Sequence, residues 1–244
     1  MKYEIAIPSR GRPKSVITIQ NIQLDKKLFT IFVDSLQEAS EYQKANPGVK
    51  VVVTGKRGIT KTRNFILDYY PENSKIVTMC DDIQAIQRLS ASGKTLITIV
   101  GGDLDTFIQK GFEICMKNKT KLWGVYAVPN YFFMSHTLSP DGFIIGTFSG
   151  IIISGIRMDE QLSLKEDYDF TIKHILKYKK VVRFNNYVVK AKHYSNKGGC
   201  VSYRTPKREE VSINRLLELY PEYIRLNPRR ENEILLKFPR RKKC

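Results

Sequence analysis

Two adjacent carboxylates, Asp81 and Asp82, directly follow the short apolar segment Ile76–Met79 and Cys80. Paired carboxylates at the carboxyl end of a strand are a common way to bind a hard divalent cation. Such an ion would bridge the phosphate oxygens of a nucleotide and stabilise a departing diphosphate. Because Asp is also a favoured helix N-cap, the pair could instead begin a helix. The loops expected beside the pair favour the functional interpretation.

A cluster of cations surrounds Gly58 at the expected start of a helix. Four of them fall within eight residues: Lys56, Arg57, Lys61 and Arg63. Positive charge combined with the N-terminus of a helix makes a site that attracts anions such as phosphate. Helical spacing puts Arg63 and Asn64 on one face, with Lys61 beside them. A solvated basic turn is the alternative, and the order of residues is not that of a P-loop.

Acidic residues open a later helix, expected at Glu166–Lys177; they are Glu166, Asp167 and Asp169. The helix dipole favours acids in the first turn, so this pattern arises without any function. Its functional interpretation is a general base, a carboxylate that accepts the proton of an attacking hydroxyl group.

The three histidines have different surroundings. His193 ends a predicted strand and precedes the glycine-rich segment 194–199, which suits a metal ligand beside a closing lid. An ordinary surface histidine would have the same pattern. His174, in the middle of a helix, and His136, in an aromatic loop, are interpreted as structural.

The first part of the chain alternates strands and helices. Strands are predicted at Lys2–Ile7, Leu28–Val33, Val49–Val53 and Ile76–Met79. The helices between them are predicted from Pro13 to about Gln23, from Ser35 to about Ala45, and at Ile59–Tyr70. Leu28–Val33 is apolar throughout, as in strands buried on both faces, and Ser35 with Glu38 forms a capping-box pattern. The alternation predicts a parallel sheet covered by helices on both faces.

The carboxyl edge of this sheet is the expected ligand site, because ligands of such sheets bind outside the carboxyl ends of the strands. Four segments meet there by construction: Pro8–Arg12, Asp34, Thr54–Arg63 and Cys80–Ile83. The carboxylate pair and the basic helix start therefore belong to one edge of the sheet.

Beyond Ile83 the pattern changes. Helices are predicted at Asp103–Lys119, Glu166–Lys177 and Val211–Tyr220, and strands at Leu122–Val128, Phe143–Ile156, Val181–Phe184 and Tyr187–Lys192. An aromatic loop at Asn130–Pro140 and a polar, glycine-rich segment at Tyr194–Pro206 separate some of them. With no repeat and no linker, the chain is predicted to be one α/β domain of two halves with a basic tail.

Charge is the strongest signal in the composition of the 244 residues. Lys and Arg number 41 against 24 Asp and Glu, which gives a net charge of +17. A surplus of this size creates a positive field that attracts polyanions and phosphorylated ligands. A protein that is merely basic throughout, without such a ligand, would have the same surplus of charge. Hydrophobic residues make up 42% of the chain, which excludes global disorder. No apolar run approaches the roughly 18–20 residues of a membrane span.

Two further features concern the compartment and the C-terminal part. The four cysteines have no paired spacing: Cys80, Cys115, Cys200 and Cys244. This disfavours a disulfide scaffold and a structural zinc site, and together with the absence of a signal peptide it suits a reducing cytoplasm.

The basic residues between Arg225 and Lys243 are expected either to contact the phosphates of DNA or to form a solvated tail.

Four motifs in this order resemble the GT-A glycosyltransferases, which are nucleotide-sugar enzymes with a mixed, mainly parallel α/β sheet. The motifs are Ile5–Arg12, Gly58–Asn64, Cys80-Asp81-Asp82 and Glu166-Asp167, and the resemblance covers about residues 2–195. The Pro8–Arg12 and Lys61–Asn64 segments are most similar to a branch of DNA-modifying enzymes that includes the base-J-associated glucosyltransferases. Members of that branch glycosylate a hydroxymethylated pyrimidine in DNA.

The resemblance assigns roles residue by residue. The uridine or its ribose would face Pro8, Ser9, Arg10, Arg12 and Asp34. The diphosphate would face Lys61, Arg63 and Asn64. The ribose and the metal would be held by Asp81 and Asp82. The pair Glu166-Asp167 resembles the acidic pair whose second member is the acceptor base of inverting enzymes. His193 resembles the late metal-ligand histidine of some members. Because Cys80–Ile83 departs from the family's DxD pattern, which aspartate contacts the metal stays open.

The resemblance implies a metal-dependent enzyme, using Mn²⁺ or Mg²⁺, that moves a sugar from a UDP-sugar to a hydroxymethylated pyrimidine in DNA. It implies a glycosyltransferase domain at 1–206, with a nucleotide-binding half at 1–83 and an acceptor half at 84–206, followed by a basic helical extension at 207–244. Neither a membrane nor an obligate protein partner is expected. One alternative is a glycan or protein acceptor, which leaves the charge of +17 unexplained. Another is a nucleic-acid-binding module or a nuclease, although a two-metal nuclease needs more clustered carboxylates.

Overall fold

The computed structural model describes residues 1–191 and 204–238, and its centre is a ten-stranded mixed sheet. Along the sheet the strands are β3 (Lys50–Val53), β2 (Phe29–Val33), β1 (Glu4–Pro8), β4 (Lys75–Met79), β9 (Phe148–Ile152), β7 (Leu122–Tyr126), β10 (Val182–Ala191), β5 (Ile83–Leu89) and β6 (Leu96–Ile99). The short strand β8 (Leu138–Ser139) pairs with β10.

The strand directions confirm a mixed, mainly parallel sheet. Strands β1 to β4 pair in parallel. Strand β9 runs antiparallel between β4 and β7, and β10 is parallel to β7. The parallel strands are joined by helices, and every residue of β2 is buried, as its continuous apolar sequence predicts.

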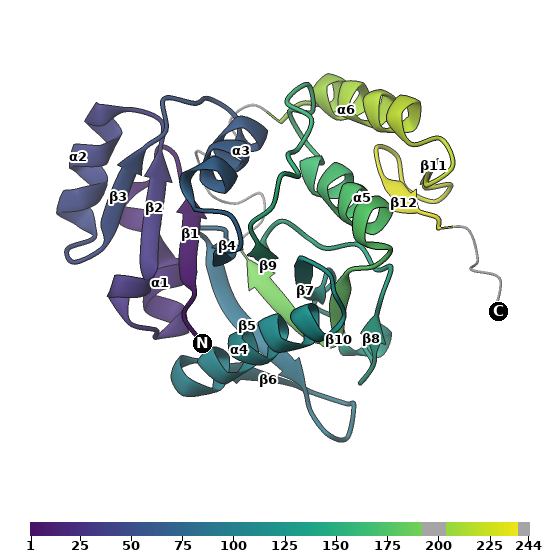
Figure 1. Ribbon diagram of the computed structural model, residues 1–244, viewed down its shortest axis with the longest axis horizontal. Coiled ribbons are helices and arrows are strands. Elements are labelled where there is room, and N and C mark those ends of the chain that lie inside the picture. Colours follow the sequence, from purple (N-terminus) through teal and green to yellow (C-terminus); the bar gives the residue numbers. More distant parts are fainter. Residues whose placement is uncertain (192–203, 239–244) are drawn as a thin grey trace.

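Helices cover both faces of the sheet, as expected (Figure 1). On one face lie α1 (Ile17–Ile22), α2 (Leu36–Ala45) and α4 (Gly101–Lys117). On the other lie α3 (Ile59–Tyr69) and α5 (Glu166–Tyr178). The fully buried Trp123 of β7 packs edge-on against Phe107 and Phe112 of α4, with ring centroids 5.5 and 5.4 Å away. None of the described helices is long and apolar enough to cross a membrane.

The chain after residue 203 forms a C-terminal unit, residues 204–238, on the outer side of α5. It consists of α6 (Pro206–Leu219) and a hairpin of β11 (Ile224–Leu226) and β12 (Ile234–Leu236). A separate apolar cluster joins it to α5: Leu162, Ile172, Ile213, Leu216, Tyr220, Ile224 and Ile234. Figure 1 shows the unit beside α5, far from β1–β3. The boundary near 206 between domain and extension stays a prediction.

The structure differs from the sequence prediction mainly in the second half. Strands β5 and β6 were not predicted, because the buried residues of β5 recur every third position (Ile83, Ile86 and Leu89) and do not alternate. Strand β10 is one strand where two were expected. Its pairing with β7 shifts register between Phe184 and Val188, and the Asn185-Asn186 pair at this irregularity reads as a turn in the sequence. Of the segment Phe143–Ile156, only β9 is strand.

Buried His174 on α5 makes the stability of the fold depend on pH. Its side chain is 0% exposed, and Nδ1 lies 2.8 Å from the carbonyl oxygen of Phe170. Burial lowers the pKa of His174 to about 4, and nearby Lys177 and Lys121 add to this effect. The interpretation of His174 as structural agrees with this position.

We expect acidification below pH 6.5 to destabilise the protein through His174, because the unfolded chain binds a proton that the folded chain excludes. At pH 5 this contribution is about 2 kcal/mol. Urea unfolding of His174→Gln between pH 7.5 and 5 should show a smaller loss of unfolding free energy than the parent protein. The exposed His136 provides the control, since His136→Gln should keep the parental pH dependence. Equal pH dependence in His174→Gln and the parent would contradict this expectation.

Candidate active site

The carboxyl ends of β1, β2 and β4 open into a cleft of about 640 Å³ that reaches across to the start of α5. Most of the site residues predicted from the sequence line it: Pro8, Ser9, Arg10, Arg12, Asp34, Arg63, Asp81, Asp82, Glu166 and Asp167. The β-strand ends and the first turn of α5 are far apart in sequence, and the sheet order brings them to one cavity. A volume of this size is within the usual range for a small-molecule site.

Asp81 is held at the floor of the cleft by the loop that follows β1. Its side chain is 1% exposed, and Oδ2 accepts a hydrogen bond from the Ser9 hydroxyl. Arg12 Nη2 lies 2.9 Å from Asp81 Oδ1. Tyr42 of α2 fixes the loop, because its hydroxyl lies 2.8 Å from Ser9 Oγ and accepts a hydrogen bond from Arg12 N at 3.0 Å. Burial raises the pKa of Asp81 to about 6, and Arg12 and Ser9 oppose this effect.

Asp82 shares the same cation and is the more accessible carboxylate of the pair. Its Oδ2 lies 3.8 Å from Arg12 Nη1, and 12% of its side chain is exposed. Arg12 lies against both carboxylates, and carboxylate oxygens are the ligands that Mg²⁺ and Mn²⁺ prefer. The pair therefore suits a divalent ion. Within residues 1–191 and 204–238, no third His, Cys, Asp or Glu completes a metal-binding group. His193 lies outside the described residues.

A further acidic side chain, Glu38 of α2, supports two of the loops that line the cleft. Its Oε1 accepts a hydrogen bond from Gly11 N at 2.6 Å, and its Oε2 accepts one from Asp34 N at 3.3 Å. The Asp34 carboxylate is 3.3 Å from Arg10 Nε and 3.7 Å from Arg57 Nε. The sequence pattern identified Glu38 as part of a capping box, but not that this carboxylate connects the two loops.

Arg63 and Glu166 form a buried ion pair beneath the cleft surface. Arg63 Nη1 is 2.8 Å from Glu166 Oε1, and Nη2 donates to the carbonyl oxygen of Gly146 at 2.7 Å. Burial raises the pKa of Glu166, and Arg63 opposes that shift. The pair anchors the start of α5 to α3. Glu166 is thereby engaged in holding this helix in place.

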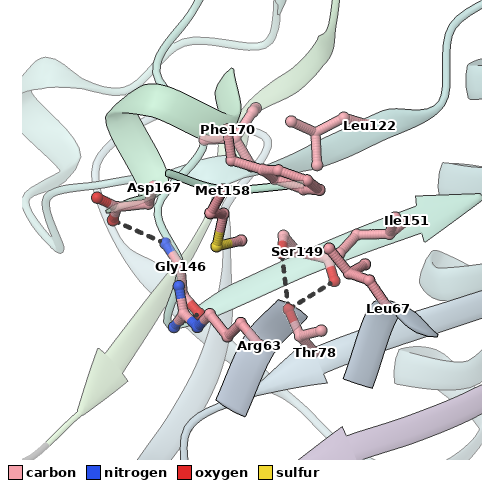
Figure 2. Close-up of a pocket in the computed structure, with 11 residues that line it drawn as sticks. Arg63, Leu67, Thr78, Leu122, Gly146, Ser149, Ile151, Met158, Asp167 and Phe170 are labelled. Carbon is pink, nitrogen blue, oxygen red and sulfur yellow. Dashed lines mark hydrogen bonds between the residues drawn. The ribbon is translucent and has the colours of Figure 1, made fainter. Parts of the chain in front are cut away.

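Asp167 is oriented by backbone groups and remains half-buried at the cleft. Its Oδ2 accepts a hydrogen bond from Gly146 N at 3.0 Å, and its Oδ1 accepts one from Tyr168 N at 3.1 Å. Figure 2 shows Asp167 and Arg63 on either side of Gly146. A Cβ at position 146 would overlap with Arg63 Nη1, so a side chain there would displace the guanidinium from its buried pair with Glu166. Lys165, just before α5, adopts φ 61°, an uncommon conformation for a residue other than glycine.

A second, much smaller cavity lies behind Asp167 (Figure 2). Its volume is about 10 Å³, and it is enclosed by Leu67, Leu122, Ile151, Met158 and Phe170 together with polar groups. The Thr78 and Ser149 hydroxyls on its wall bond to each other at 2.8 Å. This space is at the lower limit for one water molecule. The large cleft is therefore the candidate substrate site.

Two predicted donor residues do not line the cleft. Asn64 points toward the segment after β9, where Nδ2 donates to Met158 O at 2.9 Å and Oδ1 accepts from Met158 N at 2.8 Å. Lys61 is exposed on α3. The face of α3 that carries Thr60, Arg63 and Asn64 packs against the 144–162 segment. Of the three residues predicted to face the diphosphate, Arg63 is therefore the one that lines the cleft.

The cleft also contains residues that were not predicted to belong to the transferase site. They are Tyr168 and, from the C-terminal unit, Arg204, Arg230 and Glu233. Arg230 was predicted only as one of the basic residues from Arg225 onward that could contact DNA phosphates. The available signal was a hairpin pattern: the alternating segment Ile224-Arg225-Leu226 and the apolar segment Ile234–Leu236 flank a polar stretch with Asn, Pro and Glu.

The fold is a mixed, mainly parallel α/β sheet with helices on both faces, and its cleft holds a carboxylate pair after β4 and an oriented carboxylate at the start of α5. The chain belongs to the TET-associated glycosyltransferase family, whose family model matches residues 3–199. It is therefore an enzyme that transfers a sugar.

The other comparisons give distant similarity. The structure of 4-diphosphocytidyl-2C-methyl-D-erythritol synthase from Anaerococcus prevotii DSM 20548 is 10% identical, with a TM-score of 0.39. That alignment covers 87% of this chain and 96% of the synthase. No curated protein matches the chain.

Proposed function

We propose that the enzyme transfers a sugar from a UDP-sugar to a hydroxymethylated pyrimidine base in DNA. The observation that carries this proposal is a family match over residues 3–199, which supply most of the residues that line the cleft. The family's association with TET supports an acceptor among modified DNA bases. The net charge of +17 supports a polyanionic acceptor, because a positive field concentrates DNA at the protein surface.

The donor is proposed to bind at the ends of β1, β2 and β4. The Pro8–Arg12 loop and Asp34 would contact the uridine or its ribose, and Arg12 with Asp81 would lie nearest the ribose and diphosphate. Arg63 lies one layer deeper, bound to Glu166 and Gly146, so its proposed contribution is positive charge beneath the diphosphate. The Ser9, Tyr42 and Arg12 hydrogen bonds support this role, since they hold the loop in one conformation before the donor arrives.

A divalent ion, Mn²⁺ or Mg²⁺, is proposed to bind at Asp82 with Asp81. When bound, it would neutralise the negative charge that develops on the leaving diphosphate. Arg12 would share the same carboxylates and add a second positive charge at that position.

Asp167 is the proposed acceptor base. Its carboxylate would take the proton from the hydroxymethyl group of the pyrimidine. At the same time the hydroxymethyl oxygen would bond to the anomeric carbon of the sugar, and the bond from that carbon to the diphosphate would break. The hydrogen bonds from Gly146 N and Tyr168 N would keep its carboxylate oriented toward the acceptor. A substituent at position 5 of a pyrimidine points into the major groove, so transfer does not require the base to leave the duplex.

Calorimetry tests the donor part of this proposal. UDP titrated in the presence of Mn²⁺ should bind, and more tightly than GDP. Arg10→Ala should weaken UDP binding roughly tenfold, since it removes a charged contact at the cleft. Lys14→Ala is the matched control, because Lys14 is exposed just beyond the loop and outside the cleft lining. Absence of UDP binding, together with DNA binding, would favour the nucleic-acid-binding alternative.

A further inference from the structure

The C-terminal unit reaches into the cleft although it lies outside the region of family similarity. Arg204, Arg230 and Glu233 line the cavity together with Asp167 and Tyr168. The family match ends at residue 199, before the unit begins. Arg204, Arg230 and Glu233 therefore line the cleft from outside the region that the family model matches.

The unit is fastened to the helix that carries Asp167. Tyr168 of α5 donates a hydrogen bond to Ile234 O at 3.2 Å, and the Tyr220 hydroxyl donates to Asp169. Arg215 of α6 donates to Asp159 Oδ2 at 2.9 Å. These hydrogen bonds act in addition to the apolar cluster that packs between α5 and α6. The hairpin is consequently held at a fixed position relative to the proposed base.

Arg230 stands at the hairpin turn, where the described residues give it one ion-pair partner, Glu233. Its Nη1 is 3.2 Å from Glu233 Oε1, and 72% of its side chain is exposed. Glu233 is itself held by Asn227, whose Nδ2 donates to Oε2 at 3.2 Å. Arg204 is less exposed than Arg230, with 33% of its side chain accessible, and its Nη1 lies 3.5 Å from Glu209 Oε1. The Arg230 guanidinium thus keeps an open side for an anion.

We propose that Arg230, assisted by Arg204, binds a backbone phosphate of the acceptor polynucleotide beside Asp167. The assignment rests on the proposed function. A guanidinium presents a planar set of donors that suits phosphate oxygens. The C-terminal unit packs on α5, which carries the proposed catalytic base, whereas the loops proposed to bind the donor follow β1 and β2 toward the other end of the sheet (Figure 1). The acceptor, not the donor, is therefore the ligand expected to contact this unit.

The salt dependence of DNA binding provides a specific measure of this contact. Each phosphate neutralised by a cation releases counterions, so log affinity falls with log salt by about 0.9 per contact on duplex DNA. Loss of Arg230 should therefore reduce the slope by about one contact. Its neighbour Arg229 has the same charge and is exposed but does not line the cleft, so Arg229→Ala is a matched control.

The experiment compares the parent, Arg230→Ala, Arg230→Lys and Arg229→Ala. Binding to a fluorescent duplex containing 5-hydroxymethylcytosine is measured from low to moderate salt, and steady-state transfer and UDP affinity are measured in parallel. We expect Arg230→Ala to flatten the salt slope by about one and to raise KM for DNA, with kcat and UDP affinity retained. Arg230→Lys should restore the slope, and Arg229→Ala should match the parent.

Two different failures can be told apart. If the parent transfers sugar to DNA but Arg230→Ala and Arg229→Ala have equal slopes and KM values, the phosphate site is refuted and the proposed function stands. If the parent neither binds nor modifies any DNA, the proposed function falls and the phosphate site falls with it. Arg230 is largely exposed, so urea unfolding should give the same free energy for all four proteins.

Discussion

Replacing Asp167 with asparagine is expected to lower the turnover number by about 100-fold or more while leaving UDP affinity unchanged. The amide keeps the size of the side chain but cannot accept the acceptor's proton. The hydrogen bonds from Gly146 N and Tyr168 N reach the two side-chain positions of Asp167, so one of them would be lost. Steady-state transfer and UDP calorimetry on the same preparation separate catalysis from donor binding.

A variant of the neighbouring Glu166 distinguishes Asp167 from Glu166 as the catalytic base. Glu166→Gln should weaken the buried pair with Arg63 and reduce the free energy of unfolding, because it leaves the guanidinium without its counter-charge. An inactive but stable Glu166→Gln together with an active Asp167→Asn would move the base to position 166. If both variants kept full turnover, the reaction would use no carboxylate base at the start of α5.

Asp82→Ala is expected to reduce turnover by about 10²- to 10⁴-fold while the protein remains folded. The side chain lies at the cleft surface and outside the apolar clusters, so its loss removes the proposed metal ligand without opening the core. Measured rates with increasing Mn²⁺ should show that the variant no longer responds to the ion.

A matched acid outside the cleft controls for the change in charge. Glu41→Ala, on the exposed side of α2, should keep the parental rate and Mn²⁺ response. Excess EDTA should silence the parent enzyme to the level of Asp82→Ala. Full parental activity in EDTA would contradict the proposed metal requirement.

The first half of the fold could be predicted because its signals are local. Strand β2 is apolar throughout, and Ser35 accepts the predicted cap hydrogen bond from Glu38 N. Strand β5 escaped prediction because its burial depends on pairing with β10, which lies about a hundred residues later in the chain. Non-local pairing of this kind leaves no regular pattern in the strand's own sequence.

The candidate site was predictable where polar residues directly follow strands or open a helix. Asp81, Asp82 and Asp167 are of this kind, and all three line the cleft. Asn64 sits at the same helix start as Arg63 but turns toward Met158, and helical spacing alone could not separate these directions. The roles of Tyr42 and the C-terminal unit depend on tertiary packing, which residue spacing does not encode.

The most direct test of the proposed function is mass spectrometry of nucleosides. Hydroxymethylated DNA is incubated with the enzyme, Mn²⁺ and a panel of nucleotide sugars, then digested to nucleosides. The proposed function predicts a new nucleoside heavier than the hydroxymethylated one by a single sugar residue, formed with a UDP-sugar and absent with unmodified DNA or with Asp167→Asn. No heavier nucleoside with any donor, while the same enzyme labels a glycan or protein acceptor, would contradict it.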